Sequence, residues 1–146
     1  MFLSNSKESL SSKSRVSNFK LESTQETFNV IEDDLRELIK PFNLNQEKFG
    51  EILVSLSEAI TNAVRHGNKY DSNKSVDLQF IADEEKLFFR VSDEGNGFDY
   101  DSVPDPTLPE NILCCGGRGV YIMKALADEF SYSDNGRTVE MGFSID

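Results

Sequence analysis

Three side chains able to exchange protons or form strong hydrogen bonds recur four residues apart near the middle of the chain: Glu58, Asn62 and His66. Residues at this spacing share one face of a helix, so we expect a carboxylate, a carboxamide and an imidazole in one row. Solvated faces more often carry Glu and Lys. The row is therefore either an ordinary polar face or part of a site.

Two glycine pairs form a second candidate feature. Gly95 and Gly97 come directly after an expected strand, and Gly117 and Gly119 come directly before an expected helix. Glycine lets a backbone approach a ligand closely, and the free amides at a helix N-terminus favour an anion such as phosphate. Taken alone, Gly95 and Gly97 are better explained by a turn, and Gly117 and Gly119 by the start of a loop.

Asp93 is the third candidate. Leu87, Phe89 and Val91 alternate with more polar residues, and this period of two places Asp93 on the same face of the strand. That face should be covered by helices, where a carboxylate rarely lies without a partner. Alternatively, Asp93 simply begins the turn into Gly95.

A long helix must carry Glu58 and Asn62. We expect it to open at the capping residue Asn45 and to end at Gly67 and Asn68. Its apolar stripe recurs at helical spacing: Phe49, Ile52, Leu53, Leu56, Ala59, Ile60, Ala63 and Val64.

The remaining elements follow from similar patterns. A short strand over Val16–Leu21 precedes a helix that Ser23 or Thr24 caps and Pro41 ends, with Phe28, Ile31, Leu35, Leu38 and Ile39 as its apolar face. A hairpin over residues 76–91, a helix from Val120 and a last hairpin turned at residues 134–136 complete the chain. This order predicts an α+β fold: a two-layer α/β sandwich with a mixed, mostly antiparallel sheet and helices on one face.

Composition narrows the function. The 146 residues suit one domain, and 26 acidic against 15 basic residues leave a formal charge of −11, which disfavours nucleic acid as a partner. No apolar run is long enough for a signal peptide or a membrane span, so we expect a cytoplasmic protein. With a single His, a zinc site is not expected.

Two segments stand apart from these elements. Residues 1–14 are rich in Ser and Lys without periodicity, so we expect a flexible leader outside the fold, followed by the domain at 15–146. Three prolines, Pro104, Pro106 and Pro109, predict a long loop between the glycine pairs, of the kind that often forms a lid.

Taken in order, these motifs resemble those of the GHKL (Bergerat-fold) ATPases, which include the histidine kinases. Residues 58–62 match the N box, residues 93–97 the first glycine box and residues 117–119 the second. The chain more closely resembles the RsbW-type anti-sigma factor serine/threonine-protein kinases, over nearly all of residues 15–145. The stretches SEAITNAVRHG at 57–67 and GRGVYIMKAL at 117–126 carry this closer resemblance.

The resemblance implies roles for these residues. Asn62 would be the ligand of Mg²⁺, and Asp93 would accept a hydrogen bond from the exocyclic amine of adenine, where guanine presents a carbonyl oxygen instead. Gly95 and Gly97 would let the backbone pass beside base and ribose. The β- and γ-phosphates of ATP would be held by the amides of Gly117, Arg118, Gly119 and Val120.

Glu58, one turn before Asn62, would accept the proton of an attacking hydroxyl. In RsbW-type kinases this hydroxyl belongs to a serine or threonine of an anti-anti-sigma (STAS-type) protein. Most of the catalysis would come from positioning and charge neutralisation.

Some positions depart from the family pattern. A Thr commonly follows a Gly in the last hairpin and helps to hold adenine, but here Arg137 follows Gly136. Thr138 comes next, and by parity it faces away from Val139, so this contact is left open. Cys114 and Cys115 are either small hinge residues, which we prefer, or redox-sensitive. His66 either lines the site or caps the helix end.

The first functional hypothesis is an ATP-dependent kinase that binds a sigma factor and phosphorylates its antagonist, so that partners are switched. The second is an ATP-gated binding module without phosphotransfer, and the third a plain ATPase. Glu58 favours the first, because a pure binder needs no base. No phosphoacceptor helix pair precedes the domain, so we do not expect a complete histidine kinase. By analogy we expect a homodimer.

Overall fold

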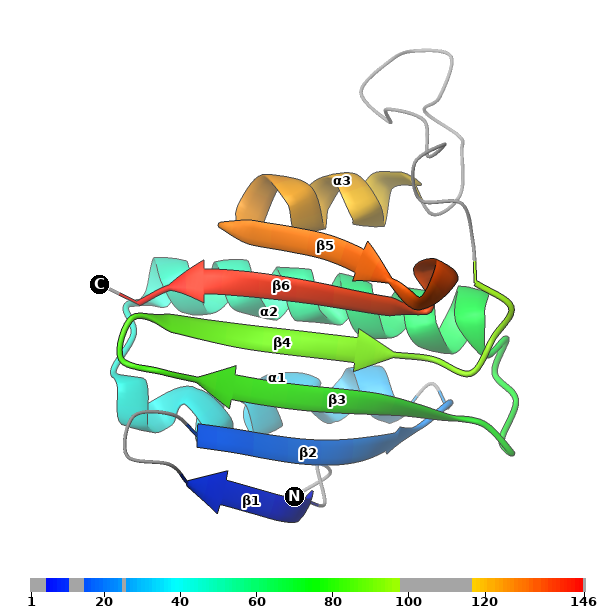
Figure 1. Ribbon diagram of the computed structural model, residues 1–146, viewed down its shortest axis with the longest axis horizontal. Coiled ribbons are helices and arrows are strands. Elements are labelled where there is room, and N and C mark those ends of the chain that lie inside the picture. The colour runs from blue at the N-terminus through cyan, green and yellow to red at the C-terminus, as the bar shows by residue number, and fades with distance from the viewer. Residues whose placement is uncertain (1–4, 11–14, 25, 98–116, 146) are drawn as a thin grey trace.

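The computed structural model describes residues 5–10, 15–24, 26–97 and 117–145 of the chain (Figure 1). Its strands and helices are, in order, β1 (Asn5–Leu10), β2 (Arg15–Glu22), α1 (Glu26–Ile39), α2 (Gln46–Thr61), β3 (Ser75–Ala82), β4 (Lys86–Ser92), α3 (Gly117–Leu126), β5 (Glu129–Ser133) and β6 (Thr138–Ser144). Among the described residues, short helical turns lie at η1 (Lys40–Phe42), η2 (Asn62–Gly67) and η5 (Asp134–Gly136).

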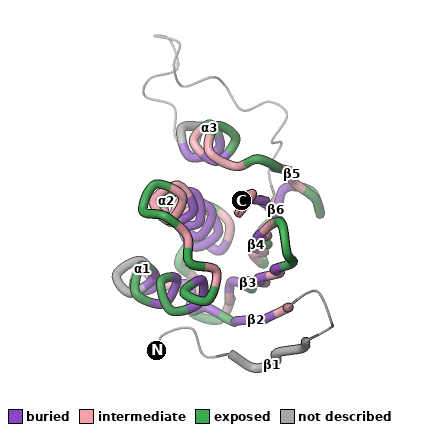
Figure 2. Tube along the Cα trace, turned by 90° about the vertical axis from the view of Figure 1, so that its left-hand side faces the viewer, coloured by how far each residue is buried: buried purple, intermediate pink, exposed green. Residues whose placement is uncertain are grey.

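The strands form one sheet in the order β1-β2-β3-β4-β6-β5. Helices α1, α2 and α3 all lie on one face of it, so the molecule has one helical layer and one sheet layer (Figure 2). The predicted α+β sandwich is confirmed. Neighbouring strands are antiparallel in every described pair, whereas the sequence had suggested a mixed sheet.

The core lies between the two layers. Alternate residues of the strands point into it, and Phe80, Phe89 and Phe143 are fully buried in neighbouring strands. The ring centroids of Phe80 and Phe89 are 5.2 Å apart, and those of Phe89 and Phe143 are 6.2 Å apart. Burial of each such side chain contributes about 1.5–3 kcal/mol, so these rings help to hold strands β3, β4 and β6 against the helices.

Helix α2 is the long helix predicted around Glu58. Oδ1 of Asn45 accepts the backbone N–H of Lys48 at 2.8 Å, which caps its first turn as expected. Ile52, Leu56, Ala59 and Ile60 are buried toward the sheet. After Thr61 the helix widens into the π-helical turn η2, a rare conformation that recurs at functional sites.

Strand β1 is an addition to the prediction. Residues 5–10 pair with β2 at the sheet edge, with an irregularity between Asn5 and Lys7. The expectation that residues 1–14 lie outside the fold is therefore wrong for residues 5–10. An edge strand is held mainly by backbone hydrogen bonds, which a polar segment can make without an apolar pattern.

Two parts of the prediction lie outside the described residues: the proline-rich lid and the cysteine pair, all within residues 98–116. In the part of the chain that is described, no helix is both long enough and apolar enough to span a lipid bilayer.

Candidate functional site

Glu58 and Asn62 lie at the point where α2 meets α3. The stripe of buried residues on α2 turns both side chains away from the deepest part of the core, and each is half-buried. The backbone N–H of Asn62 donates to the carbonyl oxygens of Glu58 and Ala59, so the two side chains are one turn apart as predicted.

Gly119 lies directly against these two side chains. A Cβ at this position would be 2.7 Å from Oε2 of Glu58 and 3.2 Å from Nδ2 of Asn62, so a larger residue would displace the Glu58 carboxylate. Gly119 belongs to the first turn of α3, together with Gly117, Arg118 and Val120. The first amides of a helix have no partner within it, so a carboxylate, a carboxamide and the N–H groups of a helix N-terminus meet at one place.

The chemistry of this cluster suits a metal-bound phosphate. The carboxamide oxygen of Asn62 is a hard donor of the kind that Mg²⁺ accepts alongside phosphate oxygens and water. The amides and the dipole of α3 suit the phosphate itself. His66 is exposed at the end of η2.

Asp93 follows β4 and lies on the helix side of the sheet, as parity predicted. Its carboxylate occupies the space over Gly67, at the end of η2, where a Cβ would overlap the carboxylate atoms. A Cβ at Gly95 would likewise overlap the carbonyl oxygen of Gly67. The sequence suggested only a helix cap for Gly67, because contacts between residues so far apart leave no local pattern.

The environment of Asp93 changes its acidity. Burial raises the pKa of its carboxyl above the ordinary value, and the charge of Asp134 acts in the same direction. The N–H of Gly95, Arg137 and, more weakly, Lys74 oppose this rise. Tyr132 lies within electrostatic range: burial, and then the charge of Asp93, raise the pKa of its hydroxyl.

Gly97 joins the first glycine box to the turn between β5 and β6. It has a φ of +79°, and a Cβ there would overlap the carbonyl oxygen of Asn135. Within the turn η5, Asn135 and Gly136 also have positive φ, in agreement with the predicted Asn-Gly turn. A glycine is therefore required at 97 by both conformation and space.

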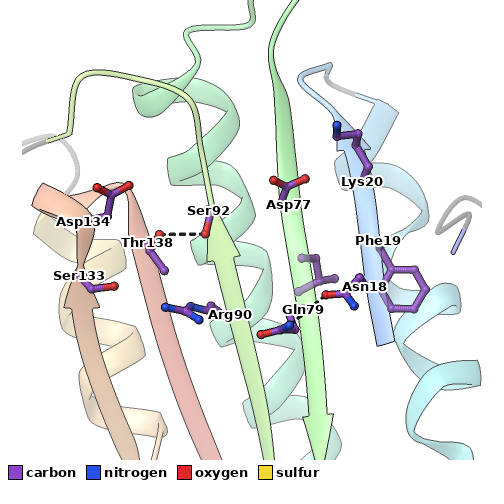
Figure 3. A pocket seen from close by; sticks show the side chains of 11 residues that line it. Asn18, Phe19, Lys20, Asp77, Gln79, Arg90, Ser92, Ser133, Asp134 and Thr138 are labelled. Carbon is purple, nitrogen blue, oxygen red and sulfur yellow. Dashed lines mark hydrogen bonds between the residues drawn. The ribbon is translucent and has the colours of Figure 1, made fainter. Parts of the chain in front are cut away.

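Arg137 and Thr138 lie on opposite faces of the sheet. Nε of Arg137 donates to the carbonyl oxygen of Gly95 at 2.8 Å, on the side of Asp93. The hydroxyls of Thr138 and Ser92 are 2.9 Å apart on the open face (Figure 3). Arg137, and not Thr138, thus stands beside Asp93 at the position of the usual family Thr.

The open face of the sheet carries a shallow hollow (Figure 3). Its lining is mostly polar: Asn18, Phe19, Lys20, Asp77, Leu78, Gln79, Arg90, Ser92, Ser133, Asp134 and Thr138. Glu58, Asn62, Gly67 and Asp93 are not part of this lining. The hollow is therefore separate from the site that the sequence motifs define, which lies on the helical side.

Comparison with known proteins agrees with this geometry. Residues 21–143 match the histidine kinase-like ATPase domain family, and the chain belongs to that family. Within it, the chain is similar to serine-protein kinase RsbW of Bacillus subtilis (strain 168), with 36% identity over 102 residues, or 65% of this chain and 64% of that protein. Serine-protein kinase RsbW of Staphylococcus aureus (strain JH9) is 35% identical over 96 residues, 60% of each chain.

These alignments span less than two thirds of the relatives' own length. A crystal structure of the RsbU and RsbW domains of a Mycobacterium tuberculosis protein shares the fold, with a TM-score of 0.55 and 16% identity. That match covers 87% of this chain and 31% of the other.

Proposed function

We propose that this protein is an ATP-dependent serine/threonine-protein kinase of the RsbW type. It would bind a sigma factor and phosphorylate an anti-anti-sigma (STAS-type) antagonist, which then loses its hold on the kinase. The observation that carries the proposal is the cluster of Glu58, Asn62 and Gly119, since a pure binding site needs no carboxylate next to the phosphate-binding turn. The similarity to two serine-protein kinases supports the same reaction.

In the proposed reaction, the hydroxyl oxygen of the antagonist's serine or threonine attacks the γ-phosphorus of ATP. The new O–P bond forms as the bond to the β–γ bridging oxygen breaks, and ADP leaves with that electron pair. Glu58 accepts the proton of the hydroxyl, while the amides of α3 hold the phosphate oxygens. Mg²⁺, held through Asn62, would neutralise charge on the phosphates.

Adenine would be recognised at Asp93, on the other side of η2. The carboxylate accepts the exocyclic amine of adenine and meets a carbonyl oxygen in guanine or hypoxanthine, so ATP is favoured over GTP and inosine triphosphate. Gly95 and Gly97 keep the adjoining backbone free of side chains. We place this reaction in the cytoplasm, where ATP is abundant.

The test is to incubate the purified protein with γ-labelled ATP, Mg²⁺ and a lysate of its host. We expect label on one small protein, at Ser or Thr, and none with Glu58→Gln, which should still bind ATP. Glu51→Gln is the matched control, because Glu51 lies on the same helix and pairs with Lys48 at 3.6 Å. Full transfer by Glu58→Gln would remove Glu58 from the mechanism.

Two other results would replace the proposed kinase function with another function. Release of labelled free phosphate without labelled protein would indicate a plain ATPase. Binding of ATP with neither product would indicate an ATP-gated binding module. The proposed partners are tested by separate measurements. Co-purification with the host's sigma factors, with and without ATP, tests sigma-factor binding. Sedimentation of the free protein tests the homodimer that we propose by analogy with the family.

A further inference from the structure

Residues 93–95 are held from two sides by residues outside the recognised motifs. On one side, the backbone N–H of Glu94 donates to Oδ1 of Asn68 at 2.7 Å. On the other, Nε of Arg137 donates to the carbonyl oxygen of Gly95 at 2.8 Å, and the N–H of Asp93 donates to the carbonyl oxygen of Arg137 at 3.0 Å. Each of the three residues therefore has a backbone group fixed by Asn68 or Arg137.

The orientation of the Asp93 carboxylate depends on this backbone. The N–H of Gly95 donates to Oδ1 of Asp93 at 2.8 Å, so the peptide between Glu94 and Gly95 sets where the carboxylate points. Asn68 holds the middle residue of that short segment, and Arg137 holds its two ends. Among the described residues no donor reaches Oδ2, which leaves this oxygen for the amine of a base.

Asn68 is itself held rigidly. Its side chain is buried, with 1% exposed, and its Nδ2 donates to Oγ of Ser23 at 2.8 Å and to the carbonyl oxygen of Ser75 at 2.9 Å. Ser23 in turn donates to the carbonyl oxygen of Lys74 at 2.8 Å. All hydrogen-bonding positions that Asn68 directs at the protein are used, so it cannot turn without breaking several bonds.

Arg137 is anchored in a similar way. Its Nη1 donates to the backbone carbonyl of Asp134 at 3.1 Å and to the Asp134 carboxylate at 3.3 Å. The guanidinium thereby links the turn η5 to Gly95. Its positive charge also favours the ionised form of Asp93.

We propose that Asn68 and Arg137 are positioning residues that aim Oδ2 of Asp93 at the exocyclic amine of adenine and so determine the preference for ATP over 6-oxopurine nucleotides. This inference rests on the proposed ATP site. It assigns base specificity to a clamp, formed by Asn68 and Arg137, on the backbone of residues 93–95. In this chain Arg137 and not Thr directly follows Gly136.

The experiment compares the dissociation constants of ATP and inosine triphosphate, which carry the same phosphates and differ at the base amine. Asp93→Asn serves as the reference variant, because it should lose the preference for ATP over inosine triphosphate. We expect Asn68→Ala and Arg137→Met to weaken ATP binding about tenfold and inosine triphosphate binding less than about twofold. Melting temperatures are measured in parallel.

Three further variants separate positioning from general stability. Ser23→Ala removes the hydrogen bond between Asn68 and Ser23 but leaves the bond between Asn68 and Glu94. It should therefore lower the melting temperature and keep the wild-type ratio of the two affinities. Asn68→Asp keeps an acceptor for the N–H of Glu94 and loses both donors, and it should keep more discrimination than Asn68→Ala. Arg137→Lys should partly restore what Arg137→Met loses.

The results distinguish a failure of the clamp from a failure of the proposed ATP site. If Asp93→Asn loses discrimination while Asn68→Ala and Arg137→Met keep it, the clamp is only structural and the inference is overturned. The same holds if Ser23→Ala loses discrimination as strongly as Asn68→Ala. A wild-type protein that binds neither nucleotide would overturn the proposed function together with the inference. Arg137→Met keeps the test open if Asn68→Ala does not fold.

Discussion

The carboxylate of Asp93 lies on Gly67, in the space that a Cβ would take. This contact joins the end of η2 to the end of β4, and it brings the N-box helix and the first glycine box together. Since Asp93 has only two side-chain torsions, it cannot yield to a larger neighbour without moving its oxygens. The contact therefore makes the size of residue 67 a determinant of the site.

Gly67→Val should displace the Asp93 carboxylate. We expect ATP affinity to fall about tenfold or more and that for inosine triphosphate to fall much less, since only the base contact is moved. Isothermal titration calorimetry with both nucleotides measures this. Gly50→Val is the matched control, because no heavy atom outside its own helix lies within 4 Å of a Cβ at Gly50. Equal losses for the two nucleotides would argue against the displacement.

Gly119→Ala should impair transfer more than folding. The new methyl group would meet Oε2 of Glu58 at 2.7 Å, and Oε2 is the end of a flexible side chain that can move aside. Stability should hardly change, but the displaced base should slow phosphotransfer about 10- to 100-fold. Single-turnover kinetics and thermal unfolding separate the two effects. Gly50→Ala supplies the control, and an unchanged transfer rate would contradict the placement of Glu58.

Asn62→Ala should abolish the dependence of ATP binding on Mg²⁺. In the wild type we expect ATP to bind about tenfold or more tightly with Mg²⁺ than with a chelator, because the carboxamide oxygen helps to hold the ion. In the variant the two affinities should become similar. Thr61→Ala, one residue earlier, is expected to behave as the wild type. A variant that keeps the full Mg²⁺ effect would exclude Asn62 as the ligand.

Discrimination between ATP and inosine triphosphate should decline on acidification. Burial raises the pKa of Asp93, so its carboxylate takes up a proton at a higher pH than an ordinary aspartate, whose pKa is near 3.9. The protonated form is the weaker acceptor, and ATP affinity falls as the pH falls through this pKa. Arg137→Met removes a charge that lowers the pKa, so the loss should begin at still higher pH.

The ratio of the two affinities, measured from about pH 8 to about pH 5, isolates the base from titration of the shared phosphates. The raised pKa of Asp93 also affects the free energy of unfolding. Ionised Asp93 destabilises the fold above its folded-state pKa, and this destabilisation is relieved as the pH falls. Asp93→Asn should therefore not lower the melting temperature at neutral pH. A marked destabilisation would contradict burial as the main cause of the shift.

Local patterns were sufficient to predict most of the fold. Helical spacing of the apolar residues on α2, the Asn45 cap and the alternation in β3, β4 and β6 are all observed. Parity also placed Asp93 on the helix side, because the side-chain period of a strand is fixed by its backbone geometry. Strand β1 was missed because edge pairing of a polar segment leaves no periodic apolar signal.

The sequence by itself determined the three motifs, the family they resemble and the faces on which Glu58, Asn62 and Asp93 lie. Only the tertiary structure decided what these side chains meet. The contact of Gly67 with Asp93, the closeness of Gly119 to Glu58 and the bonds from Asn68 and Arg137 to residues 93–95 join segments far apart along the chain. Such contacts depend on how layers pack, and packing leaves no mark at a fixed spacing in the sequence.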